Sequence, residues 1–155
     1  MPPFEIESLQ SLKQWEGREF PATEWFPVTE DRIEKFADAT EDHQWIHVDR
    51  GRAAHESPFG DCVAHGFLTL SLLSYFLRQA LQVRSGVGMS INYGLNKVRF
   101  PLAVRAGSAI RARISLLSVR ESAEFVDATF LIHVEGQSSD KPCCVAEWLV
   151  RYYPR

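Results

Sequence analysis

The stretch Gly66–Leu81, GFLTLSLLSYFLRQAL, decides how the rest of the chain must fold. Apolar residues occur on every side of a helical wheel drawn through it, and only serine and threonine dilute them before Arg78 and Gln79. A helix that is apolar all round is buried all round. At sixteen residues the stretch is too short and too hydroxylated for a membrane helix, which needs ~20 apolar residues. The sequence therefore predicts a long helix that other elements of the chain enclose.

Alternating apolar and polar residues after this helix predict the enclosing layer. Each of three segments has one apolar face, as a half-buried strand requires. These strands are Ser108–Val119, Phe125–Val134 and Val145–Tyr153, and Met89–Phe100 is expected as another strand. We expect an antiparallel meander that curls around the helix, which is the α+β arrangement called the hot-dog fold. Because an open sheet edge invites pairing, we also expect a homodimer that joins two sheets.

The residues before the central helix predict shorter elements. Two prolines make Arg18–Val28, REFPATEWFPV, suitable for an edge strand. Thr29 is a good N-cap for a helix that ends near Ala39-Thr40, because acidic residues follow it in the first turn. Short helices are also expected at Ile6–Trp15 and at Asp49–His55.

Length, composition and charge narrow the class of protein. A chain of 155 residues, 45% hydrophobic and 24% charged, fits one globular domain over residues 1–155. A net charge of -3 argues against a general nucleic-acid binder, which needs a basic face. The sequence shows no secretory signal pattern and no membrane-spanning stretch. Cys62, Cys143 and Cys144 are odd in number and two are adjacent, so we expect reduced thiols and a cytoplasmic protein.

The stretch Ala39–Asp49, ATEDHQWIHVD, concentrates groups that can perform chemistry. His43 and His47 are four residues apart, a spacing that would place two metal ligands on one helix face. However, Gln44 stands where a zinc protease has its glutamate base, and no third ligand is evident. We therefore expect no metal site.

Asp42 and His47 form the sharper pair. Five residues apart across a turn, they could hold one water molecule, with the carboxylate and the imidazole both able to move protons near neutral pH. The alternative is purely structural: Asp42 would cap the following turn and His47 would be a partly buried histidine. Spacing alone does not decide between the two interpretations.

Gly66 could supply an oxyanion site at the start of the central helix. A glycine allows close approach of a ligand, and the free N–H groups of the first turn can stabilise a developing negative charge. An ordinary glycine N-cap explains the residue equally well. Cys62 and His65 do not suggest a reactive thiol, because nothing orients the histidine.

Polar residues in the segment YGLNKVRF give a third group of candidates. Asn96, Lys97 and Arg99 could reach ligand phosphates at the end of a strand. Solvated charges on an edge strand explain them equally well. The sequence leaves both interpretations open.

Three blocks of the chain resemble the MaoC-like dehydratases, the family of (R)-specific enoyl-CoA hydratases, and more closely its nodulation-protein-N-like branch. They are FADATEDHQWIHVDRGRAA at Phe36–Ala54, VAHGFLTLSLL at Val63–Leu73 and INYGLNKVRFP at Ile91–Pro101. The family's hydratase motif, Asp-x-Asn-Pro-(Leu/Ile)-His, falls on Asp42 to His47, with Gln44 in place of Asn and Trp45 in place of Pro.

The resemblance implies a hot-dog domain with a hydratase overhang, here Ile46–Phe59, and a role for several residues. Asp42 and His47 would be catalytic, and the Gly66 N–H would be the oxyanion donor. The further substrate-binding candidates are Gln44, His65, Asn96, Lys97 and Arg99. The implied reaction is reversible hydration of trans-2-enoyl thioesters of CoA or acyl carrier protein to (3R)-hydroxyacyl thioesters, without a cofactor.

Two other functions remain open on the same fold. A hot-dog thioesterase often carries a catalytic carboxylate on its central helix, but Gly66–Leu81 contains no Asp or Glu. A non-catalytic subunit that binds acyl thioesters is the second alternative, and the presence of both Asp42 and His47 argues against it.

Overall fold

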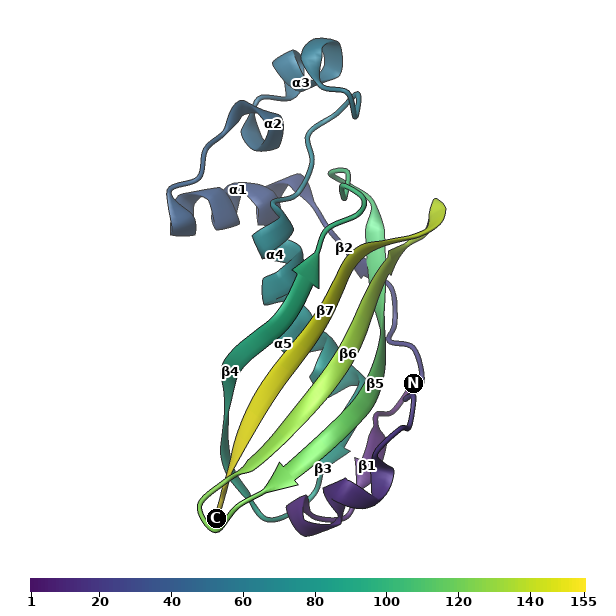
Figure 1. Ribbon diagram of the computed structural model, residues 1–155. Coiled ribbons are helices and arrows are strands. Elements are labelled where there is room, and N and C mark those ends of the chain that lie inside the picture. Colours follow the sequence, from purple (N-terminus) through teal and green to yellow (C-terminus); the bar gives the residue numbers. More distant parts are fainter.

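The computed structural model describes residues 1–155 and has the α+β architecture that the sequence predicts. A curved antiparallel sheet of five strands, in the order β2-β5-β6-β7-β4, wraps around a central helical segment (Figure 1). Its strands are β2 (Phe26–Pro27), β4 (Val87–Arg99), β5 (Ala109–Glu121), β6 (Val126–Gly136) and β7 (Ser139–Pro154). The four long strands lie where the sequence predicts strands.

The central helix is interrupted, which corrects the expectation of one continuous helix over Gly66–Leu81. It consists of α4 (Gly66–Ser71) and α5 (Leu73–Ala80). At Leu72 the backbone N–H is shared among the carbonyls of Leu68, Thr69 and Leu70, which tightens the turn locally. Leu81 is already extended and begins β3 (Leu81–Val83).

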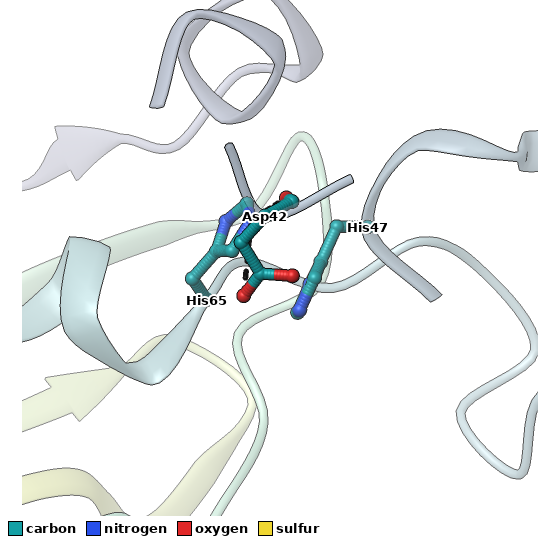
Figure 2. A group of neighbouring side chains, drawn as sticks. All are labelled: Asp42, His47 and His65. Atoms are coloured by element: carbon teal, nitrogen blue, oxygen red, sulfur yellow. Dashed lines mark hydrogen bonds and ion pairs between the residues drawn. The ribbon is translucent and has the colours of Figure 1, made fainter. Parts of the chain in front are cut away.

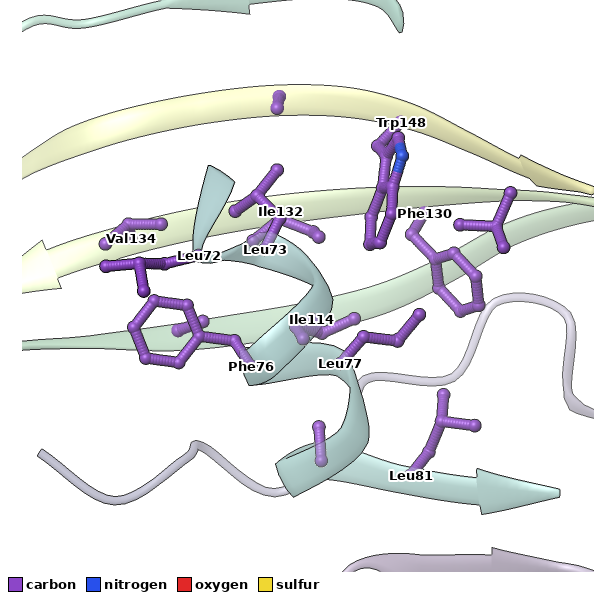
Figure 3. Packing of buried hydrophobic residues seen from close by; sticks show 14 of the residues in the cluster. Leu72, Leu73, Phe76, Leu77, Leu81, Ile114, Phe130, Ile132, Val134 and Trp148 are labelled. Atoms are coloured by element: carbon purple, nitrogen blue, oxygen red, sulfur yellow. The ribbon is translucent and has the colours of Figure 1, made fainter. Parts of the chain in front are cut away.

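The core lies between α5 and the concave face of the sheet. Phe76 from the helix and Ile114 and Phe130 from the sheet are completely buried (Figure 3). Burial of each such side chain stabilises the fold by roughly 1.5–3 kcal/mol relative to exposure. One side of the helix is not enclosed, because Phe67 and Ser71 remain exposed. The all-round burial that the sequence predicts is therefore not reached in the single chain.

The strand order differs from a simple meander. Strands β5, β6 and β7 follow one another as hairpins, but β4 pairs with β7 instead of its sequence neighbour β5. The segment between β4 and β5 is hydrogen-bonded to the residues just before α4. The Ala64 N–H donates to Val104 O, and the Ala106 N–H donates to Cys62 O. These bonds lead the chain across one end of the sheet before β5 begins, so β4 becomes an edge strand.

The N-terminal segment packs along β5 and under the end of the helix. The predicted helix at Ile6–Trp15 is a shorter 3₁₀ helix, η1 (Leu9–Trp15). Ser8 is its N-cap, and the side chains of Ser8 and Ser11 each accept a hydrogen bond from the other residue's backbone N–H. Before it, β1 (Phe4–Ile6) pairs in parallel with β3. The predicted edge strand at Arg18–Val28 follows β5, but only β2 pairs regularly, since prolines interrupt the run of N–H donors.

Three helices leave the core and lie beyond the end of the sheet where α4 begins (Figure 1). They are α1 (Glu30–Thr40), α2 (Trp45–Val48) and α3 (Arg50–Glu56). Thr29 caps α1 as predicted, and Asp49 caps α3 by accepting from the Arg52 N–H at 3.0 Å. We call residues 30–56 the excursion. No helix of the chain is long and apolar enough to cross a membrane.

Candidate active site

Asp42, His47 and His65 meet where the excursion faces the start of α4. One ligand atom from each side chain lies within 4.8 Å of the others. Asp42 comes from the turn between α1 and α2, His47 from α2, and His65 from the residue before α4. Figure 2 shows the Asp42 carboxylate and one ring nitrogen of His47 projecting to the same side of the group. The fold thus brings together the two predicted catalytic groups and one further histidine.

His47 is held in one orientation and one tautomer. Its side chain is buried, with 9% of the residue exposed, and Nδ1 lies 2.6 Å from the backbone carbonyl of Val63. Because a carbonyl can only accept, Nδ1 carries the proton and Nε2 keeps a free lone pair. Burial lowers the pKa of His47 below its ordinary value of 6.5, and the neighbouring His65 lowers it further. His47 is therefore a neutral imidazole at pH 7, with Nε2 available as a base.

The Asp42 side chain is 54% exposed and nearly free of local bonds. Its Oδ1 receives only a long 3.4 Å contact from the Gln44 N–H. The N-cap of α2 is Gln44, without a side-chain cap bond. Capping therefore does not explain Asp42, and the carboxylate is free to accept hydrogen bonds from a ligand or water.

His65 connects the other two residues. Only 4% of it is exposed, and Nε2 donates to the Asp42 backbone carbonyl at 2.9 Å. Its ring stacks on that of His47, with centroids 3.8 Å apart and planes at 22°. Nδ1 is buried and has no hydrogen-bond partner. From the sequence, His65 was predicted to bind substrate, and its contacts with Asp42 and His47 were not predicted. Its position directly before Gly66 could have indicated that it lies at the site.

Gly66 is the first residue of α4, so its N–H has no acceptor within that helix. A side chain at this position would meet the Phe100 ring at 3.1 Å, closer than ordinary carbon contacts. A side chain here would crowd the Phe100 ring, which would have to shift by a few tenths of an ångström. The Phe100 ring thus forms a wall against Gly66, the first residue of α4.

The remaining predicted binding residues stand apart from this group. Gln44 is exposed at the start of α2, and Asn96, Lys97 and Arg99 are exposed on β4. No hydrogen bond or ion pair joins any of the four side chains to Asp42, His47 or His65. Arg99 is nearest in sequence to the wall residue Phe100, but its guanidinium donates to the Val98 carbonyl.

The cluster contains the ligand types of a metal site, but two of its four ring nitrogens are engaged. His47 Nδ1 and His65 Nε2 are each bonded to a backbone carbonyl. His47 Nε2 and the Asp42 carboxylate are free, and the remaining free nitrogen, His65 Nδ1, is completely buried; a catalytic zinc site takes three protein ligands. His43 does not belong to the cluster, because its Nε2 pairs with Asp38 Oδ1 at 2.8 Å.

Two connected grooves run along the central helix, away from Gly66. The smaller, of about 250 Å³, is lined by Leu70 and Leu95 among others and begins one helical turn beyond Gly66. The larger, of about 780 Å³, continues between α5 and strands β4 and β7, with Leu77 and Val150 in its wall. Trp148 lines both. Neither groove includes Asp42 or His47.

Comparison with known proteins identifies the class. Residues 12–136 match the model of the MaoC like domain, and the chain belongs to the MaoC-like dehydratase family. The chain is 48% identical over 148 residues to 3-hydroxyacyl-thioester dehydratase Z of Mycobacterium tuberculosis, covering 95% of this chain and 97% of that protein. It is 41% identical over 143 residues to nodulation protein N of Rhizobium meliloti, covering 92% and 89% respectively.

A solved structure supports the fold. The (R)-hydratase of A. caviae, involved in PHA biosynthesis, superimposes with a TM-score of 0.69 at 24% identity, covering 87% of this chain and 94% of that one. The curled antiparallel sheet is thus the hot-dog fold of this family. The protein is an enzyme of the hydratase and dehydratase class.

Proposed function

We propose that this enzyme catalyses the reversible addition of water to trans-2-enoyl thioesters, giving (3R)-hydroxyacyl thioesters. The observation that carries the proposal is the pairing of a neutral, tautomerically fixed His47 with the free Asp42 carboxylate, within 4.8 Å of each other. Two acceptors side by side suit one water molecule with two O–H donors. The similarity to 3-hydroxyacyl-thioester dehydratase Z supports the choice of substrate.

In the proposed reaction, His47 Nε2 removes a proton from the water as its oxygen forms a bond to C3. The electron pair of the C2=C3 bond moves toward the thioester carbonyl, and C2 then receives a proton from the Asp42 and His47 pair. The net change is the addition of one water, so the reaction balances without a cofactor. General acid and base groups of this kind typically contribute about 10²–10⁴ in rate.

The thioester oxygen becomes negative as water adds, and the Gly66 N–H is the proposed donor to it. The donor has no competing acceptor within α4. With the carbonyl at Gly66, the acyl chain would enter the grooves along α5, whose walls are largely apolar. Gln44, Asn96, Lys97 and Arg99 remain predicted contacts for the CoA or acyl-carrier portion.

The test is hydration of crotonyl-CoA by the wild type, Asp42→Ala and His47→Ala, followed at the enoyl-thioester absorbance with chiral analysis of the product. Each variant should lose about 10²–10⁴ in rate. Asp42→Ala should melt as the wild type does because its side chain is 54% exposed, whereas His47→Ala should stay folded but melt lower, because it removes a buried ring that bonds to Val63 and stacks on His65. His43→Ala is the matched control from the same turn and should keep its rate. Near-normal turnover by either variant, or an (S) product, would contradict the proposal.

The two alternative functions predict different outcomes. A thioesterase would release free thiol from acyl-CoA, yet α4 and α5 contain no carboxylate. A non-catalytic subunit would bind the thioester without changing its absorbance. The same assay, with a thiol reagent added, separates all three.

We further propose a homodimer formed through β4. This strand is the last in the sheet order, so one edge has no partner, and it exposes Met89, Ile91 and Leu95. Pairing with a second copy would satisfy the edge and cover the apolar side chains. Analytical ultracentrifugation should give twice the 17.7 kDa of one chain, and Ile91→Lys should favour the monomer. A monomeric wild type would contradict this assembly.

Three buried free thiols support a reducing, cytoplasmic location.

A further inference from the structure

We propose that His65 is a positioning residue that fixes Asp42 and His47 relative to each other and does not itself contact substrate. The inference rests on the proposed function and deepens it. Three observations carry it: the burial of His65, its hydrogen bond to the Asp42 carbonyl and its stacking on His47.

Apart from the exposed pair of His43 with Asp38, the turn that carries Asp42 has few other restraints. Thr40, Glu41, Asp42, His43 and Gln44 are all exposed. Glu41 adopts a left-handed conformation with φ of 59°, which costs energy for a residue with a side chain. The hydrogen bonds that Asp42 makes are a long one within the turn and the 2.9 Å bond from His65. That second bond is the one that ties the carboxylate-bearing residue to the folded core.

The second contact of His65 is with the proposed base. The two rings stack at 3.8 Å, so His65 blocks one face of the His47 imidazole. The Val63 carbonyl holds Nδ1 of His47 at the same time. With one face covered and one edge bonded, the remaining freedom of His47 is small, and Nε2 stays directed to the side where the Asp42 carboxylate projects (Figure 2).

The third contact fixes His65 itself. Phe36 of α1 packs against its ring, with centroids 4.9 Å apart, on an element of the excursion. Along the chain His65 directly precedes Gly66, the proposed oxyanion donor. One buried side chain therefore links the carboxylate, the base and the donor. A misplacement of about 1 Å in such a set can cost on the order of 10²-fold in rate.

Two substitutions separate the hydrogen bond from the space that the ring fills. His65→Phe keeps an aromatic ring for stacking but removes the donor to Asp42. His65→Gln gives up the ring, but its Nε2–H₂ can reach the same carbonyl. If His65 positions Asp42, the Phe variant should show a kcat for crotonyl-CoA hydration that is lower by about 10- to 100-fold, with KM nearly unchanged. The Gln variant should recover most of that loss.

A measurement without substrate keeps this inference distinct from the proposed function. Backbone ¹⁵N relaxation should give Asp42 an order parameter near the rigid value of about 0.85 in the wild type and in His65→Gln, and a value approaching about 0.6 in His65→Phe. If the wild type hydrates no enoyl thioester, the proposed function fails while this measurement still decides whether His65 orders Asp42. Equal rigidity of Asp42 in all three proteins, or full activity of His65→Phe, would overturn the positioning role. Equal loss of activity in both variants would overturn the part of the proposal that rests on the hydrogen bond to Asp42, because the retained donor would then have no effect.

Discussion

The core and the excursion of this protein are built on different principles. In the core, α5 and the concave face of the sheet form one cluster of buried apolar side chains, in which Phe76, Ile114 and Leu116 are inaccessible to solvent. In the excursion, residues 30–56, four residues are buried, Ile33, Ala37, His47 and Ala53. Exposed ion pairs such as that of Arg50 with Glu30 lie on its surface.

The chemistry lies in the less well packed of the two regions. Asp42 and His47 both belong to the excursion, whereas the core contributes the edge on which they rest, at Val63, His65 and Gly66. Loops and small elements on a rigid scaffold commonly carry function in this way. Stability and activity should therefore respond to different substitutions in this molecule.

The largest effect on stability should come from the core. Leu116→Ala removes a side chain with no exposure and should lower the free energy of unfolding by about 2–5 kcal/mol, because it leaves a cavity between sheet and helix. Its sequence neighbour Leu117 is 40% exposed and provides the matched control, with an expected change within about 0.5 kcal/mol. Chemical denaturation of both variants measures the difference, and equal losses would show that the core is not the centre of stability.

Gly66→Ala should affect rate more than stability. The new Cβ would meet the Phe100 ring at 3.1 Å and displace the wall beside the proposed oxyanion donor. We expect kcat to fall by about 10- to 100-fold, a smaller loss than removal of a complete oxyanion-hole donor can cause. The double variant Gly66→Ala, Phe100→Leu should recover activity. Failure of the second substitution to help would show that the Phe100 contact is not the cause.

The elements of the core could be predicted from the sequence better than the way in which they pair with one another. Alternation located β5, β6 and β7, and Thr29 located the start of α1, because both signals are local. The place of β4 beside β7 and the pairing of β1 with β3 were missed. The partner of a strand depends on the position of segments that are distant in the sequence. The residue pattern within one strand does not predict that position.

The same limit applies to the site. Asp42 and His47 were found from their spacing and from the family motif, since both carry chemically distinctive side chains. The link through His65 was not found, because its partner is the backbone carbonyl of Asp42, which every residue possesses. The tautomer of His47 also depends on a backbone group, the Val63 carbonyl. Side-chain identity predicts which groups are present but not which main-chain atoms orient them.

Two histidines of the excursion should titrate on opposite sides of 6.5. Burial lowers the pKa of His47, whereas the hydrogen bond to Asp38 raises the pKa of the exposed His43. For His47 the folded state binds the proton less readily than the unfolded state does, so stability is lost as pH falls from about 6.5 through the folded pKa. The rate of hydration should be level near pH 7 and fall on the same acidic side. NMR titration of the ring signals measures both values, and a His47 pKa above that of His43 would contradict the assigned environments.

The smallest effect should come from the ion pairs on the surface of the excursion. Arg50 contacts Glu30 at 2.7 Å and Asp61 at 3.5 Å, but the arginine side chain is 61% exposed. Exposed pairs contribute about 0–1 kcal/mol, so Arg50→Ala should hardly change the melting temperature, and salt should reduce even that change. Lys35→Ala, which breaks the exposed pair with Asp31 within α1, is the control. Arg50 joins α3 to the start of α1 across the turn that carries Asp42, so any loss of rate specific to Arg50→Ala would show that this pair orders the site. Equal rates in the two variants would instead leave the ordering of Asp42 to the buried contact from His65.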